Sequence, residues 1–260
     1  MPMTALITGA AKRVGRAMSL HLAERGFAIG VHYNTSPNEA QELVSAIRAK
    51  GGTAEALQAD LADLDAVGSL IDRTAASLGP VSLLINNASL FDLDTIESLD
   101  RRSWDLHMEI NLAAPLFLSQ AFARALPEGM TGNIINIIDQ RVWKLTPNFM
   151  SYTVSKSGLW TLTQTLAQAL APRIRVNAIG PGPTLKSTHQ SDEDFRRQQL
   201  SVPLQCGPSL DEICAAVSFF LESPSVTGQM IAMDGGQHLS WQTPDVVEAQ
   251  NQRRQRSNDQ

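Results

Sequence analysis

The chain has 260 residues, 43% of them apolar, with a formal net charge of −5 and no long low-complexity segment. This length and composition suit one large α/β domain with a substantial buried core, with a two-domain chain as the alternative. No basic stripe indicates a nucleic-acid surface, since only the last ten residues are locally basic, and no apolar stretch approaches the ~18 residues of a membrane span.

The cysteines and histidines indicate neither a disulfide framework nor a metal site. Cys206 and Cys214 are the only cysteines, and the five histidines do not fall at metal-ligand spacing. The first predicted strand begins within five residues of Met1, which leaves no room for a signal peptide. We therefore expect a cytoplasmic protein with two reduced thiols and no bound metal.

Short runs rich in strand-forming residues recur along the chain, each separated from the next by enough residues for a crossover helix. They lie at residues 5–8, 28–33, 54–58, 81–86, 134–138, 175–179 and 230–233. The interior runs are almost continuously apolar, as in parallel strands that helices cover on both faces. The pattern predicts a doubly wound Rossmann-type α/β domain over residues 1–240, with a seven-stranded parallel sheet, and a C-terminal tail at 241–260. In such sheets ligands bind beyond the carboxyl ends of the strands.

The first predicted strand leads into the turn TGAAKRVG, which begins at Thr8. A glycine-bearing turn between a strand and a helix typically holds a phosphate at the helix N-terminus. Gly15 falls inside the following helix, where a missing side chain allows close packing against the strand. Lys12 and Arg13 stand where further glycine would be expected.

The second strand ends without the acidic residue that NAD-selective folds place against the ribose 2′-hydroxyl. His32, Asn34 and Ser36 stand there instead, so an additional phosphate would meet no repulsion. Polar residues also follow the third, fourth and fifth strands: Asp60 with Leu61, Asn87 with Ala88 and Ser89, and Asp139. Taken singly, each is more often a turn residue or a helix cap than a site residue.

Tyr152 and Lys156 open a helical stretch, and their i, i+4 spacing places them on one face of it. A Lys near a phenol favours the ionised form, lowering the pKa of the Tyr toward neutrality so that it can exchange a proton with a substrate. The alternative is an exposed aromatic–cation pair without a function.

The motifs together resemble the short-chain dehydrogenase/reductase family over about residues 4–239. They are Thr8-Gly9, Asp60, Asn87-Ala88, Asn111, Tyr152 with Lys156, Pro181-Gly182 and Asp234-Gly235-Gly236. The resemblance implies that Asn111, Tyr152 and Lys156 are catalytic. It also implies a cofactor site, with Asp60 near the adenine and Pro181-Gly182 beside the nicotinamide. The full set of cofactor candidates is Thr8, Gly9, Lys12, Arg13, Val14, Gly15, His32, Asn34, Ser36, Asp60, Leu61, Asn87, Ala88, Ser89, Lys156, Pro181 and Gly182.

Two departures from the family majority indicate the pteridine reductase branch. Arg13 stands where the common turn has glycine, and Asp139 stands where the usual catalytic serine lies, thirteen residues before Tyr152. Pteridine reductases carry a similar turn, an Asp in place of the serine, and an aromatic residue at the position of Phe91. Segments 192–199 and 234–239 resemble bacterial enzymes similar to dihydromonapterin reductase, which also show dihydrofolate reductase activity; the parasite-type pteridine reductases are a near alternative.

This resemblance implies NADPH as the cofactor and a dihydropterin or dihydrofolate as the substrate. Arg13 would offer a fixed cation and forked donors to the 2′-phosphate of NADPH, helped by His32, Asn34 and Ser36; a solvated surface Arg is the alternative. The flat pterin ring would stack on Phe91, unless Phe91 only fills the core.

Reduction of the pterin imine requires a proton donor, for which Tyr152 and Asp139 are the candidates. Asp139 would otherwise face the amino edge of the pterin. Trp143 and Met150 either line the pocket or pack elsewhere.

Two other functions remain open at this stage. One is a carbonyl-reducing member of the same family, of the oxoacyl-carrier-protein or sugar type, which Asp139 disfavours. The other is a non-catalytic NADPH-sensing regulator, which the intact Asn111, Tyr152 and Lys156 disfavour.

By analogy with relatives we expect a homotetramer built on the leucine-rich helix at 152–171, whose leucines are Leu159, Leu162, Leu166 and Leu170. Residues 241–245 would then reach a neighbouring active site.

Overall fold

The computed structural model describes residues 3–186 and 190–241. Its sheet contains the seven predicted strands, all parallel, in the order β3-β2-β1-β4-β5-β6-β7. The strands are β1 (Thr4–Ile7), β2 (Ala28–Tyr33), β3 (Ala54–Gln58), β4 (Val81–Asn86), β5 (Gly132–Ile137), β6 (Ile174–Pro181) and β7 (Met230–Met233). The predicted doubly wound α/β fold is confirmed, with strand ends displaced by at most two residues. The predicted contact of residues 242–245 with a neighbouring subunit falls outside the described residues.

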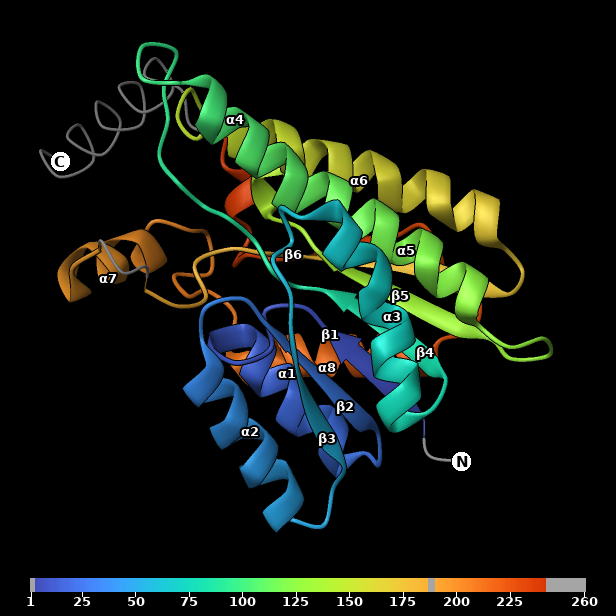
Figure 1. Cartoon of the computed structure of the whole chain (residues 1–260). Coiled ribbons are helices and arrows are strands. Elements are labelled where there is room, and N and C mark those ends of the chain that lie inside the picture. Colours follow the sequence, from blue (N-terminus) through green and yellow to red (C-terminus); the bar gives the residue numbers. More distant parts are fainter. Residues whose placement is uncertain (1–2, 187–189, 242–260) are drawn as a thin grey trace, which may run out of the picture.

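Helices cover both faces of this sheet (Figure 1). They are α1 (Arg13–Glu24), α2 (Pro37–Ala49), α3 (Leu64–Leu78), α4 (Arg101–Met108), α5 (Ala114–Ala125), α6 (Met150–Leu170), α7 (Asp192–Leu200) and α8 (Leu210–Glu222). One buried apolar cluster joins α1, α2 and α8 to one face, and a second joins α3, α5 and α6 to the other. Helix α7 lies apart from both layers and contributes no residue to the core. Among the described residues, no helix combines the length and the apolar character needed to cross a membrane.

Local hydrogen bonds fix where several helices begin. The Asp63 carboxylate accepts the backbone N–H groups of Asp65 and Ala66 at the start of α3. Ser209 and Glu212 form a reciprocal capping box at the start of α8. Each cap satisfies backbone donors that the first helical turn leaves unpaired.

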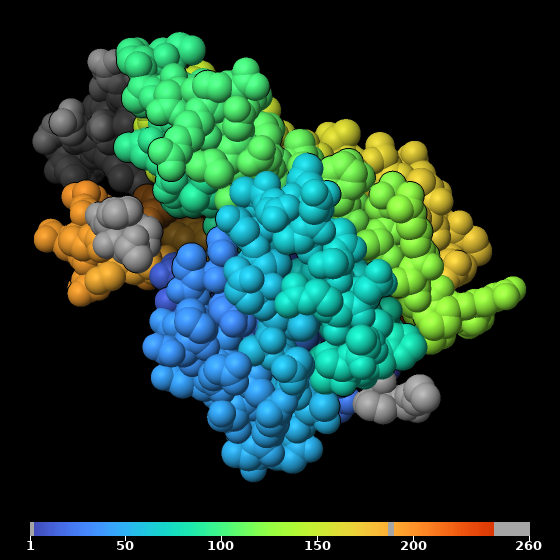
Figure 2. Space-filling view, in the orientation of Figure 1, coloured from blue at the N-terminus to red at the C-terminus, as the bar shows by residue number. Residues whose placement is uncertain are grey.

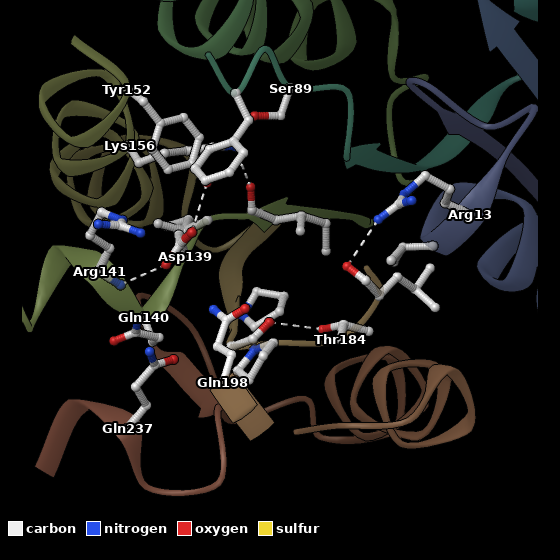
Figure 3. A pocket seen from close by; sticks show the side chains of 18 of the residues that line it. Arg13, Ser89, Asp139, Gln140, Arg141, Tyr152, Lys156, Thr184, Gln198 and Gln237 are labelled. Atoms are coloured by element: carbon white, nitrogen blue, oxygen red, sulfur yellow. Dashed lines mark hydrogen bonds between the residues drawn. The ribbon is translucent and has the colours of Figure 1, made fainter. Parts of the chain in front are cut away.

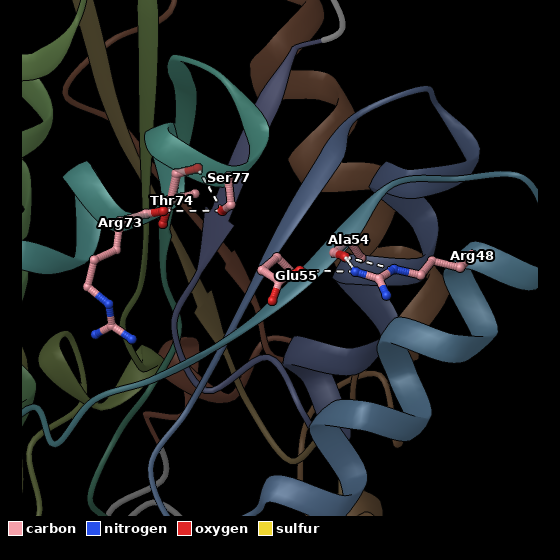
Figure 4. Close-up of polar contacts among 6 residues, drawn as sticks. All are labelled: Arg48, Ala54, Glu55, Arg73, Thr74 and Ser77. Carbon is pink, nitrogen blue, oxygen red and sulfur yellow. Dashed lines mark hydrogen bonds and ion pairs between the residues drawn. The ribbon is translucent and has the colours of Figure 1, made fainter.

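The edge strand β3 is tied to its neighbours by two arginines, and Figure 4 shows the contacts that Arg48 makes with it. Arg48, near the end of α2, donates from Nε and Nη2 to the carbonyl oxygen of Ala54 and pairs with Glu55 at 3.0 Å. Arg73 of α3 donates to the carbonyl of Gln58 at the other end of the strand. Arg48 thus holds the amino end of β3, and Arg73 holds its carboxyl end, two residues before Asp60.

The leucines of α6 mostly face the interior of the subunit. Leu159 is buried, and Leu162, Leu166 and Leu170 pack against the core clusters. The apolar surface assumed for a tetramer contact on this helix is therefore used within the chain, and the homotetramer stays a prediction. Cys206 is exposed and Cys214 buried, both as free thiols.

Candidate active site

A cleft of about 980 Å³ opens at the carboxyl ends of β1, β4, β5 and β6. Its walls come from the start of α1, the loop after β5, the first turns of α6 and one side of α7. In the space-filling view the surface is hollowed between α7 and the N-terminal part of the chain (Figure 2). The close-up shows Arg13 on one side of this cleft and Asp139, Tyr152 and Lys156 on the other (Figure 3).

The turn after β1 is built as a cradle. Gly9 adopts a left-handed φ of 60°, and the Asn87 side chain donates to the carbonyls of Thr8 and Gly9. The Thr8 hydroxyl accepts the backbone N–H groups of Asn87 and Ala88, which locks the ends of β1 and β4 together. A Cβ at Gly15 would lie 2.2 Å from the Gly9 carbonyl oxygen, so only glycine fits there.

His32 supports this turn from below instead of facing the cleft. Its Nδ1 accepts the Gly9 backbone N–H at 3.0 Å, and its Nε2 lies 3.2 Å from the Ala59 carbonyl oxygen. The ring is 2% exposed, and this burial lowers its pKa to about 4. His32 is therefore a neutral residue that positions the turn, and it is absent from the cleft lining, where it was predicted to help Arg13 at a 2′-phosphate.

The remaining adenosine-side candidates line the ends of β2 and β3 outside the cleft. Asn34 is exposed and Ser36 is partly exposed in the loop before α2. Asp60 is exposed and accepts the Ala62 backbone N–H, while Leu61 is buried.

Lys12 and Arg13 point in different directions. Lys12 forms an ion pair of 2.6 Å with Glu39 of α2, on the side of the β2–α2 loop. Arg13 donates from Nη1 to the Lys186 carbonyl (2.9 Å) and from Nη2 to the Leu185 carbonyl (3.2 Å), bridging to the segment after β6. The structure thus places Lys12 beside the β2–α2 loop and Arg13 beside the segment after β6, and the contact of Arg13 with a 2′-phosphate stays a prediction.

Arg13 itself has a φ of 53°, in the left-handed region. This backbone conformation explains why glycine is common here and costs about 1–2 kcal/mol for any other residue. A side chain retained at such a position is typical of functional sites.

Asp139 and Tyr152 form a hydrogen-bonded pair, in which Tyr152 is buried and Asp139 is partly exposed. The Tyr152 hydroxyl donates to Asp139 Oδ2 at 2.9 Å, and Asp139 Oδ1 accepts the Arg141 backbone N–H at 2.7 Å. Burial raises the pKa of Asp139. Burial, together with the neighbouring Asp139 carboxylate, also raises the pKa of Tyr152 well above its ordinary value. The pair therefore retains protons that exposed side chains would release.

Lys156 lies near Tyr152 but donates its hydrogen bond elsewhere. Its Nζ donates to the Ile137 carbonyl at 2.9 Å and lies 5.9 Å from the centre of the Tyr152 ring. Burial lowers the pKa of Lys156 to about 8. In the chain alone, burial dominates the pKa of Tyr152; a lowering by Lys156 together with the positive charge of the cofactor stays a prediction.

Asn111 lies behind this pair, inside a π-helical turn, η1 (Glu109–Ala113), between α4 and α5. Its side-chain amide pairs with both backbone groups of Leu90 and donates to the Ser155 hydroxyl. Such turns are frequent at functional sites because they re-aim one side chain. Asn111 anchors the loop after β4 to α6 and does not line the cleft.

An aromatic cluster forms the wall beside Tyr152. The Phe91 ring stacks on Phe149 with centroids 4.4 Å apart and meets Tyr152 edge-on at 4.7 Å. The Arg141 guanidinium lies 4.9 Å from the centre of the Phe149 ring. Trp143 is absent from the lining and packs against Trp160 and His238 instead.

The cleft lining includes residues that we did not predict from the sequence. Besides Phe149 and Arg141, they include Gln140, Gln190, Gln198 and Gln237. The segment of α7 carried a signal only through its resemblance to relatives. Among the predicted cofactor residues, the cleft lining includes Val14, Ala88, Ser89, Pro181 and Gly182.

The comparisons with known proteins agree with this architecture. A family model described as short chain dehydrogenase matches residues 3–197. The chain belongs to the short-chain dehydrogenase/reductase family. Similar crystal structures include FolM alternative dihydrofolate reductase 1 from Brucella suis in complex with NADP, which is 50% identical with a TM-score of 0.91 over 94% of this chain and 98% of that one.

The same enzyme from Brucella canis, complexed with NADP, is also 50% identical, with a TM-score of 0.91 over 94% of this chain and 97% of that one. A 3-oxoacyl-[acyl-carrier-protein] reductase from Staphylococcus epidermidis is 31% identical over 92% of this chain and all of its own. The relatives thus include reductases of two substrate classes.

Proposed function

We propose that this short-chain dehydrogenase is an NADPH-dependent reductase of a dihydropterin, converting dihydromonapterin or dihydrobiopterin to the tetrahydro form, with dihydrofolate as a further substrate. The observation that carries the proposal is the partly buried hydrogen bond between Asp139 and Tyr152 at the cleft. A carboxyl group whose pKa is raised by burial can hold a proton for a ring nitrogen, which a serine hydroxyl does less readily.

The turn after β1 fits a dinucleotide. The space that a Cβ at Gly15 would fill, and the N-terminus of α1 behind it, are suited to a pyrophosphate. Lys12 and Arg13 supply positive charge at the same end of the cleft. When bound, NADPH supplies the hydride for the reduction. The Brucella proteins bound to NADP, at 50% identity, support this cofactor.

The chain's own residues account for the binding and proton steps. The half-exposed face of Phe91 offers a flat surface for a pterin ring, at the edge of Tyr152. The Tyr152 hydroxyl donates a proton to a ring nitrogen, and Asp139, hydrogen-bonded to that hydroxyl, replaces it. Lys156, held by the Ile137 carbonyl, keeps a positive charge beneath the pair below a pH of about 8.

A steady-state comparison tests the proposal. NADPH consumption is measured with dihydromonapterin, dihydrobiopterin, dihydrofolate and a 3-oxoacyl thioester. We expect turnover of at least one dihydropterin with a kcat/KM well above that for the thioester. Turnover of the thioester alone would favour the carbonyl reductase. NADPH binding without turnover of any of the four would favour a regulator.

A further inference from the structure

Helix α6, which carries Tyr152, begins without a cap of its own. Phe149 precedes it in a left-handed conformation (φ 60°, ψ 48°), and its side chain makes no capping hydrogen bond. One first-turn backbone donor, the Ser151 N–H, is instead satisfied by Asp94, which lies 57 residues earlier than Ser151. A helix that depends on a distant cap is coupled to the segment that supplies it.

Asp94 makes this contact with both its backbone and its side chain. Its carbonyl oxygen accepts the Phe149 N–H at 2.8 Å. Its carboxylate accepts the Ser151 N–H at 3.2 Å and also the Ser151 hydroxyl. The side chain is 2% exposed, and the first turn of a helix favours a negative charge placed there. A buried carboxylate is tolerated because these donors replace water.

The segment around Asp94 is the one that carries Phe91. The rings of Phe91 and Phe149 are stacked with an interplanar angle of 4°, so the loop and the helix start meet twice. His107 completes the junction: its Nε2 accepts the Asp92 N–H, and its Nδ1 lies 2.9 Å from the Ser151 hydroxyl. The aromatic wall and the proton-donating hydroxyl therefore share one set of buried contacts.

We propose that Asp94 is a positioning residue for the reaction, which sets the place of Tyr152 relative to Phe91 by capping α6 from the loop after β4. The choice of a pterin as the stacked ring rests on the proposed function, whereas the placement of Tyr152 does not. Removing the carboxylate should let the first turn of α6 shift, and a displacement near 1 Å lowers turnover by up to about 100-fold.

The test compares Asp94→Ala with Asp94→Asn and with a matched control, Asp100→Ala. Asp100 caps α4 through the Ser103 N–H, is exposed, and lies outside the cleft lining. We expect Asp94→Ala to lower kcat by about 10-fold or more while the Kd for NADPH, measured by fluorescence, changes less than about twofold. Asn retains an oxygen acceptor, so Asp94→Asn should recover most of the turnover. Asp100→Ala should lose stability but keep wild-type kcat and KM.

Equal kinetics for Asp94→Ala and Asp100→Ala would overturn the proposal, because Asp94 would then be only a stabilising cap. If Asp94→Ala does not fold, Ser151→Ala removes one of the two side-chain contacts and should lower kcat in the same direction. Each ratio to wild type is measured with whichever substrate the wild type reduces. If the wild type reduces only the thioester, the pterin proposal is wrong. The Asp94 variants can then still be compared with the thioester as substrate, and that comparison tests the positioning role separately.

Discussion

Replacing Asp139 with serine separates a proton-holding role from a structural one. Serine is as good a helix cap as aspartate, so its hydroxyl can still accept the Arg141 N–H that Asp139 Oδ1 accepts now. What Asp139→Ser removes is the buried acidic group in contact with the Tyr152 hydroxyl. The substitution also restores the residue that the family majority carries here.

The sign of the stability effect follows from the pKa of Asp139. Burial raises this pKa in the folded state, so the folded chain keeps the proton at a pH where the unfolded chain has released it. Stability therefore falls as the pH rises from the ordinary value of 3.8 through the raised value. We expect Asp139→Ser to lack this pH dependence, and to be at least as stable as the wild type at a pH where the folded wild type has released the Asp139 proton.

The expected effect on activity has the opposite sign. Loss of a general acid typically lowers kcat/KM by about 100-fold or more, which corresponds to about 2.7 kcal/mol of transition-state stabilisation. Tyr152→Phe should cause a similar loss, and the double variant should be far less than additive because both groups serve one proton transfer. Melting temperature and dihydropterin turnover are measured on the same sample. A destabilised Asp139→Ser enzyme with near-normal kcat/KM would refute the reasoning and favour the carbonyl reductase.

Three further predictions concern Arg13, His32 and Lys156. Arg13→Ala should raise the KM for NADPH by about 10-fold to 100-fold and leave the KM for NADH nearly unchanged. If Lys12→Ala raises the KM for NADPH and Arg13→Ala does not, Lys12 is the residue that contacts the 2′-phosphate. His32 has a pKa of about 4 against 6.5 in the unfolded chain. The free energy of unfolding should therefore fall as the pH drops from 6.5 to about 4, by up to about 1.4 kcal/mol per pH unit. Urea titrations of the variant His32→Asn should lack this dependence on pH. Lys156 loses its charge as the pH rises through about 8, so kcat/KM should fall there; a flat profile above pH 8 would exclude the need for that charge.

The sequence was sufficient to predict the sheet and the residues at its carboxyl edge. Runs such as that at β5 are apolar enough to be covered on both faces, and this character alone implies parallel strands. Gly15 was also predictable, because a helix start packed on the turn after β1 leaves no room for a Cβ. These features depend on local pattern and on the rules of parallel sheets.

Features set by tertiary contacts were not predictable in the same way. His32 was expected to help bind a phosphate because it lies near the end of β2, but its ring is enclosed by backbone from Gly9 and Ala59. Phe149 gave no periodic signal, since its place beside Phe91 results from the left-handed start of α6. The cap from Asp94 joins segments 57 residues apart, which no local pattern reveals.

The two departures from the family majority share a physical property. Arg13 occupies a left-handed conformation that disfavours any residue with a Cβ, and Asp139 places a carboxyl group where burial disfavours its charge. Each feature lowers the stability of the folded chain, and both face the same cleft. Residues that are unfavourable for folding are expected where function requires them. Arg13 and Asp139 lie on opposite sides of the cleft, so the proposed cofactor and substrate would meet between them, with the cation on the cofactor side and the proton donor on the substrate side.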